Sequence, residues 1–206
     1  MNIEVKNSTK PVDYSKSMQI LEQRVIDVFS GRRKELLWIL EHKNVYTAGS
    51  SSKNEDVIDK KINVIKTNRG GKHTYHGKGQ KVIYFVLDLN KRSRNIRKLI
   101  NNIENCIINI LKEYNVISHA DRKNIGIWVN INKENYKIAA IGIKVKKWVA
   151  YHGFALNISN DLSKYKSIVP CGLNNKKITS LKSVGIKDFK NINTIIIKKF
   201  LDIFLW

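Results

Sequence analysis

Residues 69–89 read RGGKHTYHGKGQKVIYFVLDL, a glycine-rich polar segment that leads directly into an apolar one. Four of the eleven glycines of the chain lie within the first twelve residues of this stretch. Glycine weakens helices and strands, so this density indicates unusual backbone angles or a close approach of the backbone to a ligand. The run from Val82 to Leu89 is rich in β-branched and aromatic residues and predicts a buried strand. The combination favours a substrate-facing loop on the sheet of an α/β enzyme, although a plain solvated loop fits the composition equally well.

Hydrophobic periodicity assigns much of the remaining chain to helices and further strands. Apolar residues recur at helical spacing and predict helices over residues 14–29, 96–114 and 192–205. Further strands are predicted over residues 36–41, 125–131, 136–145 and 148–157, with turns at 132–135 and 146–147. Strands in the centre, with helices between and after them, predict an α/β (α+β) fold. We expect a single domain, residues 1–206, with a mixed central sheet flanked by helices.

The composition is that of a globular protein with a strongly basic charge. Hydrophobic residues make up 42% of the 206 residues. No apolar run reaches the roughly 18 residues that span a bilayer, and the N-terminus lacks the apolar core of a signal peptide. We therefore expect no membrane association and a cytoplasmic location.

The formal net charge of +21 suggests nucleic-acid binding at first sight. However, the chain has 30 Lys, 30 Ile and 23 Asn, and the codon bias of an AT-rich genome raises these three types together. The basic residues are also dispersed along the chain. We therefore expect no nucleic-acid partner, while the charge still favours encounters with acidic proteins.

The two cysteines lie in different settings. Cys106 borders the apolar stripe of the helix predicted over residues 96–114, so we expect it to pack in or beside the core. Cys171 lies between Pro170 and Gly172, outside any periodic pattern. Two cysteines form neither a disulfide framework nor a zinc pattern, and the five histidines show no spacing typical of metal ligands. We expect no metal.

Five ordered motifs resemble the octanoyltransferase family of lipoate biosynthesis. They are LLWILEH with VYTAGS (36–50), RGGKHTYHGKGQ (69–80), KIAAIG (137–142), YHGFALN (151–157) and PCG (170–172). The resemblance extends from Pro11 to about Leu181. Such enzymes move an octanoyl group from acyl carrier protein to a lysine of lipoyl domains. The resemblance implies a fold similar to that of biotin and lipoate protein ligases, and no cofactor.

The resemblance gives Cys171 the role of nucleophile and Lys137 the role of its partner. A nearby ammonium lowers the pKa of a thiol from its usual value of about 8.5. Lys137 would thus stabilise the Cys171 thiolate and then act as general acid and base. Cys171 would attack the thioester of octanoyl-acyl carrier protein, and the acceptor lysine would then attack acyl-Cys171. Two histidines that each precede a glycine, His76 and His152, remain alternative bases.

The resemblance also implies substrate contacts in three segments. Backbone N–H groups of the glycine-rich segments are candidate donors to the oxyanion of each tetrahedral intermediate, and small apolar residues would line a slot for an eight-carbon chain. The expected contacts are Arg69, Gly70, Gly71, Lys72, His73, Thr74, Tyr75, His76, Ala140, Ile141, Gly142, Gly153, Phe154 and Ala155. The expected acceptors are lipoyl domains of 2-oxoacid dehydrogenase complexes and the glycine cleavage H protein.

Two related activities fit parts of the same pattern. An ATP-dependent lipoate or biotin protein ligase would share the fold, but it needs no nucleophilic cysteine, so the setting of Cys171 speaks against it. An octanoyl amidotransferase, which moves octanoyl groups between lipoyl domains, would also use a cysteine. The resemblance favours acyl carrier protein as the donor.

Overall fold

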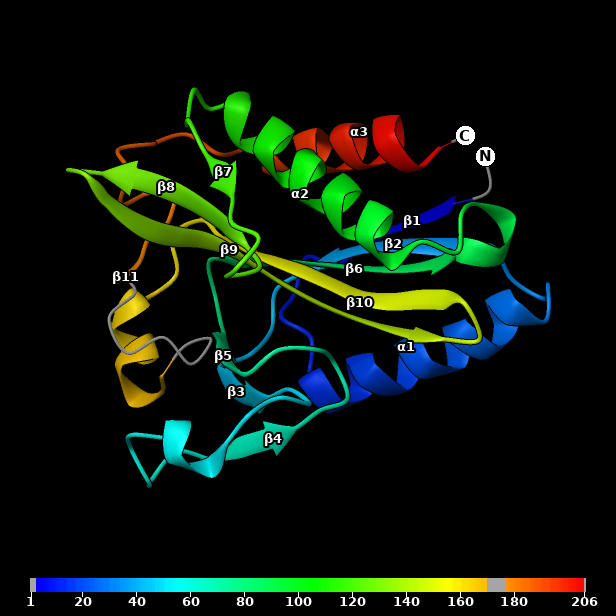
Figure 1. The fold of residues 1–206 in the computed structure, drawn as a ribbon, viewed down its shortest axis with the longest axis horizontal. Coiled ribbons are helices and arrows are strands. Elements are labelled where there is room, and N and C mark those ends of the chain that lie inside the picture. The colour runs from blue at the N-terminus through cyan, green and yellow to red at the C-terminus, as the bar shows by residue number, and fades with distance from the viewer. Residues whose placement is uncertain (1–2, 170–176, 206) are drawn as a thin grey trace.

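The computed structural model, which describes residues 3–169 and 177–205, is built around a mixed eight-stranded sheet (Figure 1). The strand order is β1-β2-β6-β10-β9-β8-β7, and β11 pairs with β9. The β1–β2 and β9–β11 pairs are parallel and the other neighbours are antiparallel. The strands are β1 (Ile3–Asn7), β2 (Glu35–Leu40), β6 (Gln80–Asp88), β7 (His119–Ala120), β8 (Ile127–Ile131), β9 (Glu134–Lys146), β10 (Val149–Asn157) and β11 (Lys177–Ile178).

A second, three-stranded sheet has the order β4-β3-β5. It consists of β3 (Val45–Ala48), β4 (Val64–Lys66) and β5 (His73–His76). The prediction of a loop over residues 69–80 is therefore wrong for residues 73–76, which form the strand β5 and are all buried. Its partner β3 lies about 30 residues earlier in the chain, and pairing over such a separation leaves no local signal in a short polar segment.

Three helices cover the two faces of the large sheet (Figure 1). α2 (Ile96–Lys112) and α3 (Ile192–Phe204) lie together on one face, and α1 (Tyr14–Phe29) lies on the other. Three short 3₁₀ helices, η1 (Asn54–Asp56), η2 (Leu89–Lys91) and η3 (Leu162–Ser167), lie in the connections. All three predicted helices and the predicted strands are confirmed. Both turns are present, but at residues 132–133 and 147–148, because β9 already begins at Glu134 and ends at Lys146. Within the described ranges, no helix combines the length and the apolar character that a membrane span requires.

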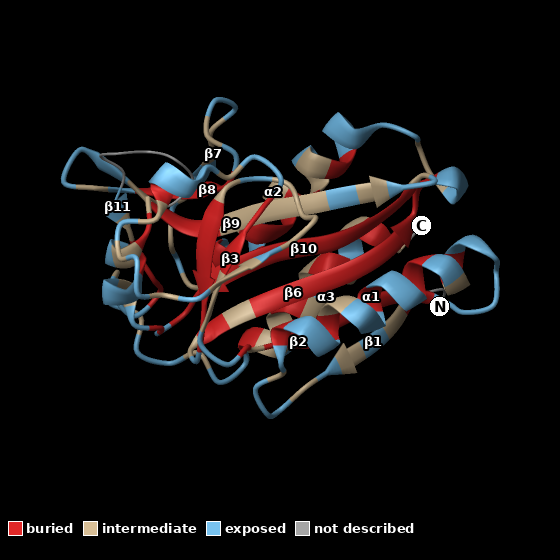
Figure 2. Cartoon of the chain, turned by 90° about the horizontal axis from the view of Figure 1, so that it is seen from below, coloured by how far each residue is buried: buried red, intermediate tan, exposed pale blue. Residues whose placement is uncertain are grey.

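The core has two parts, one on each face of the large sheet. Alternate residues of β6 point to opposite faces, and both faces are covered, which explains why residues 82–87 read as a continuous apolar run. Figure 2 shows the central strands as buried along most of their length. Cys106, a residue of α2, is fully buried in the part of the core between α2, α3 and the sheet, as expected. Burial raises its pKa to about 12.

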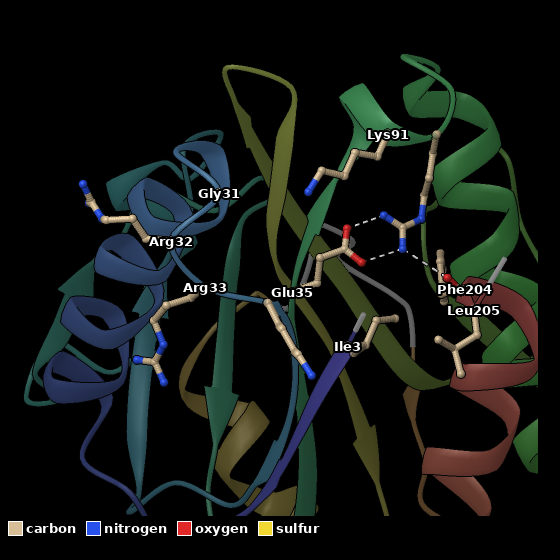
Figure 3. Close-up of a pocket in the computed structure, with 10 residues that line it drawn as sticks. Ile3, Gly31, Arg32, Arg33, Glu35, Lys91, Phe204 and Leu205 are labelled. Atoms are coloured by element: carbon tan, nitrogen blue, oxygen red, sulfur yellow. Dashed lines mark hydrogen bonds and ion pairs between the residues drawn. The ribbon is translucent and has the colours of Figure 1, made fainter. Parts of the chain in front are cut away.

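A buried ion pair joins three elements at one end of the sheet (Figure 3). The guanidinium of Arg92 donates to both oxygens of Glu35, and its Nη2 also donates to the carbonyl oxygen of Phe204 at 3.1 Å. Glu35 additionally accepts from the backbone N–H of Asp88 at 2.7 Å. The pair lies in a cavity of about 360 Å³ with several basic residues, of which Arg32 and Arg33 point away from it. We assign it a structural role, tying β2 to η2 and the end of α3.

We predict that Arg92→Ala lowers the free energy of unfolding by about 3–5 kcal/mol, because it leaves a buried carboxylate without its partner. The matched control is Lys53→Ala, which removes an exposed partner of Glu55 and should change stability very little. Urea unfolding monitored by circular dichroism measures both variants. Equal, small losses in the two variants would contradict a structural role for the Arg92–Glu35 pair.

Candidate active site

The site forms where the outer edge of β9 loses its pairing with β8. The register of β8 ends at Ala139, after a bulge at Ile127 and Trp128. Beyond this point the glycine-rich segment approaches β9, and the N–H of Gly70 donates to the carbonyl oxygen of Ile143 at 3.1 Å. A Cβ added to Gly142 would lie 3.0 Å from the Gly70 carbonyl oxygen, tighter than most such contacts, so glycine suits this close approach. The two motifs thus meet in space.

Two cavities lie next to this contact. The larger, which we call the groove, has a volume of about 530 Å³ and includes Lys137. The smaller, which we call the slot, has a volume of about 60 Å³. Four residues line both cavities and form their common rim, namely Gly71, Lys72, Ile141 and Gly142.

The slot brings together most of the substrate contacts expected from the sequence. Gly70 lines the groove instead, and His73 and Tyr75 line neither cavity. Side chains alternate along a strand, so β5 presents Thr74 and His76 to the slot while Tyr75 packs beside Tyr165 on the other side. The expected contacts in the slot are Arg69, Gly71, Lys72, Thr74, His76, Ala140, Ile141, Gly142, Gly153, Phe154 and Ala155.

Lys137 is a buried lysine, with only 4% of its surface exposed. Its Nζ donates to the carbonyl oxygen of Ile125 at 2.9 Å and lies 4.9 Å from the ring centroid of Trp128. Gly126 makes room for this position, since a Cβ there would lie 2.8 Å from Cε of Lys137. An ammonium in such surroundings differs from the solvated lysines elsewhere in the chain. Cys171, its expected partner, lies outside the described residues.

The hydrogen bonds of His76 fix its tautomer. Gln80 donates from Nε2 to Asn157 and Tyr165, so its Oε1 is the acceptor that faces Nδ1 of His76 at 2.6 Å. Nδ1 of His76 therefore carries the proton. Burial lowers the pKa of His76 to about 3, which makes its imidazole a poor proton acceptor at neutral pH.

His152 has a backbone φ of +69°, which is uncommon for a residue with a side chain. Its ring lies beside those of Tyr151 and Tyr84, on the face that α1 covers, and its Nε2 is 2.7 Å from Oδ1 of Asn68. Burial lowers its pKa to about 3 as well. The next residue must be glycine, because a Cβ on Gly153 would lie 2.0 Å from the carbonyl oxygen of Ile83.

Three residues of the slot were absent from the expected set, namely Val82, Tyr84 and His152. The run from Val82 to Leu89 indicated only a buried strand, and which of its faces borders a cavity depends on the packing of other elements. The groove also contains Asn124 and Ile125, which no sequence motif marks as functional residues. Across the described ranges, no group of three or more His, Cys, Asp or Glu side chains could hold a metal ion.

Comparisons with known proteins point to one family. Residues 13–201 match the family model described as the lipoyl protein ligase A/B catalytic domain. The chain is 42% identical to an octanoyltransferase of Wolbachia pipientis wMel, with 96% of this chain and 97% of the relative covered. It is 40% identical to an octanoyltransferase of Anaplasma marginale (strain Florida), with 98% of this chain and 96% of the relative covered.

Solved structures with the same fold include lipoate protein ligases. A putative lipoate protein ligase of T. acidophilum with bound lipoic acid has a TM-score of 0.74 at 15% identity, covering 98% of this chain and 86% of that one. A lipoate-protein ligase A bound with ATP has a TM-score of 0.72 at 15% identity, covering 97% and 85%. These likenesses confirm the expected fold.

We predict that stability falls below pH 6.5 because of three buried neutral histidines. Burial lowers the pKa of His42 to about 4 and those of His76 and His152 to about 3. The unfolded chain, with histidine pKa values near 6.5, therefore binds more protons than the folded one as the pH drops from 6.5 toward 4. Each histidine contributes a slope of up to about 1.4 kcal/mol per pH unit.

Urea unfolding between pH 7 and pH 5 measures this slope. His42→Gln should reduce it by up to about 1.4 kcal/mol per pH unit, whereas the exposed His119→Gln should leave it unchanged. Stability that is constant between pH 6.5 and pH 5 would show that these histidines are protonated in the folded protein.

Proposed function

The chain belongs to the lipoyl protein ligase A/B family as an octanoyltransferase, and on this premise we propose that it transfers octanoyl groups from acyl carrier protein, through a thioester on Cys171, to lipoyl-domain lysines. The observation that carries this proposal is the buried ammonium of Lys137 in the groove, next to the rim shared with the slot. A cation in surroundings of low polarity stabilises a nearby thiolate more strongly than one in water.

The described residues on either side of Cys171 support this pairing. The N–H of Val169 donates to the carbonyl oxygen of Asp56 at 2.7 Å, and one carboxylate oxygen of Asp56 is 4.0 Å from Nζ of Lys72 at the rim. On the other side, Ile178 pairs with Lys137 itself. An extended chain covers at most about 3.5 Å per residue. Val169 is thus linked through Asp56 to Lys72 of the common rim, and Ile178 lies beside Lys137 in the sheet.

The proposed reaction has two acyl transfers. The Cys171 thiolate attacks the thioester carbonyl, and the carrier-protein thiol leaves with a proton from Lys137. The neutral amine of the acceptor lysine then attacks acyl-Cys171, the new amide forms, and Cys171 leaves as a thiolate while Lys137 takes up the amine proton. The acyl chain occupies the slot. The N–H of Gly70 already donates to Ile143, so other backbone donors must stabilise the oxyanion.

The acceptors of the reaction are lipoyl domains, as the names of the family and of its relatives imply. We further propose that the donor is octanoyl-acyl carrier protein, whose acidic surface suits a chain with a net charge of +21. We also propose that residues 1–206 act as one catalytic domain. The likeness to an ATP-bound ligase rests on 15% identity and concerns the fold alone. The relatives at 40–42% identity favour transfer rather than ATP-dependent ligation.

We predict a single octanoyl adduct on Cys171 after incubation with octanoyl-acyl carrier protein and no ATP. Cys171→Ser should abolish both the adduct and octanoyl transfer to a lipoyl domain. The matched control is Cys106→Ser, which should retain both, because Cys106 is fully buried and its pKa is raised to about 12. Intact-mass and peptide mass spectrometry measure the adduct. An adduct on Cys106, or turnover without any adduct, would contradict the proposed mechanism.

We predict that Lys137→Met shifts the alkylation of Cys171 by iodoacetamide to higher pH and suppresses transfer, because the thiolate loses its cation. The pH midpoint of alkylation, followed by mass spectrometry, is the measurement. His76→Gln serves as the comparison and should leave the midpoint in place, since the imidazole of His76 is neutral near pH 7. A midpoint that moves with His76 rather than with Lys137 would assign the base to the histidine.

A further inference from the structure

The slot ends at the ring of Tyr84. Residues of the common rim are partly or fully exposed, whereas Val82 and Tyr84 are only 1% and 5% exposed. Tyr84 lies directly opposite Gly153 in the register of β6 and β10, and Val82 lies opposite Ala155. Gly153 and Tyr84 both line the slot, so the slot reaches the Tyr84 ring at this pair. The far end of the slot is therefore aromatic, and Ala155 forms part of its wall.

A cluster of rings encloses this end: His76, Tyr84 and His152 line the slot, and Tyr14 and His42 pack against them. We call it the ring cluster, and its members are Tyr14, His42, His76, Tyr84 and His152. Neighbouring rings have centroids 5.2–6.4 Å apart. Close packing of this kind leaves an extra methylene group no space without displacing a ring. The position of the Tyr84 ring therefore sets the depth of the slot.

Hydrogen bonds hold the Tyr84 ring at its outer end. The carbonyl oxygen of Val12 lies 2.9 Å from Nδ1 of His42, and a carbonyl only accepts, so Nδ1 carries the proton. Nε2 of His42 is then an acceptor, and the Tyr84 hydroxyl donates to it at 2.8 Å. If the phenol moved away, the Tyr84 hydroxyl and Nε2 of His42 would both remain buried without a hydrogen-bond partner, which is unfavourable. Tyr84 is thus a fixed wall.

We infer that Tyr84, anchored by His42, determines the longest acyl chain that the enzyme transfers. The inference rests on the proposed octanoyl transfer, with the acyl chain in the slot. A chain that ends against the ring fits, and each further pair of methylenes must displace a packed and hydrogen-bonded side chain. Tyr84 is a specificity-determining residue that contacts the end of the substrate remote from the thioester.

The test compares chain-length profiles of variants that deepen or fill the slot. Hexanoyl-, octanoyl-, decanoyl- and dodecanoyl-acyl carrier protein compete for one lipoyl domain, and mass spectrometry quantifies each product. Tyr84→Leu removes the wall, and the decanoyl-to-octanoyl ratio should rise about tenfold or more. Ala155→Val fills the slot beside Val82, and the hexanoyl-to-octanoyl ratio should rise by a similar factor.

Val86→Ala is the matched control. Val86 is fully buried and lies two residues beyond Tyr84 on the same face of β6, but it does not line the slot. Its truncation should lower stability and leave both product ratios within about threefold of the wild type, a margin well below the effect expected of a methylene in a pocket.

Three outcomes of this comparison test the role of Tyr84 in chain-length selection. Opposite shifts in Tyr84→Leu and Ala155→Val support the inference, and if Tyr84→Leu does not fold, the shift in Ala155→Val decides alone. Wild-type ratios in folded Tyr84→Leu, or a shift of the same size in Val86→Ala, overturn it while leaving octanoyl transfer intact. A wild-type enzyme that transfers no acyl chain of any length overturns the proposed function, a result distinct from either of the others.

Discussion

The contact between two backbones at the outer edge of β9 is the constraint on which the site depends. Once β8 has diverged, the carbonyl oxygen of Ile143 accepts from the N–H of Gly70. This hydrogen bond holds the glycine-rich segment against the strand, and Gly142 allows the approach because a Cβ there would press on the Gly70 carbonyl. The residues of this contact, Gly70 and Ile143, line the groove, and the adjacent Gly71 and Gly142 line both cavities. A side chain at Gly142 would crowd the Gly70 carbonyl and the Arg69 side chain at this edge.

Burial gives the polar groups of the site their chemical character. His42, His76 and His152 are neutral at physiological pH because the low-polarity surroundings disfavour their charged forms. Lys137 lies in comparable surroundings but has the carbonyl oxygen of Ile125 and the face of the Trp128 ring beside its ammonium. The same region thus combines neutral imidazoles that build a wall with a lysine placed to interact with an anionic nucleophile.

Local sequence patterns were sufficient to predict the long helices and strands but insufficient to predict the short strands. The helices α1, α2 and α3 follow from apolar residues at helical spacing, because each helix buries one face. β6 and β10 follow from long runs of residues that favour strands. The glycine-rich pattern indicates a loop where β5 lies, and no local pattern predicts β1, β3, β4, β7 or β11. These strands have two to five residues, and partners distant in the chain, rather than their own composition, hold them in place.

The sequence by itself determined the fold class, the family, and the residue types that the chemistry needs, because ordered motifs and periodicity are local properties of the chain. Tertiary structure alone decided which of those residues share a cavity. Thr74 and His76 face the slot, while Tyr75 faces Tyr165, because successive side chains of β5 point to opposite sides once the strand pairs with β3. Tyr84 reads as an ordinary core residue until Gly153 and His42 are seen beside it. The physical reason is that a cavity is a property of packing between elements remote in sequence, and no local pattern records it.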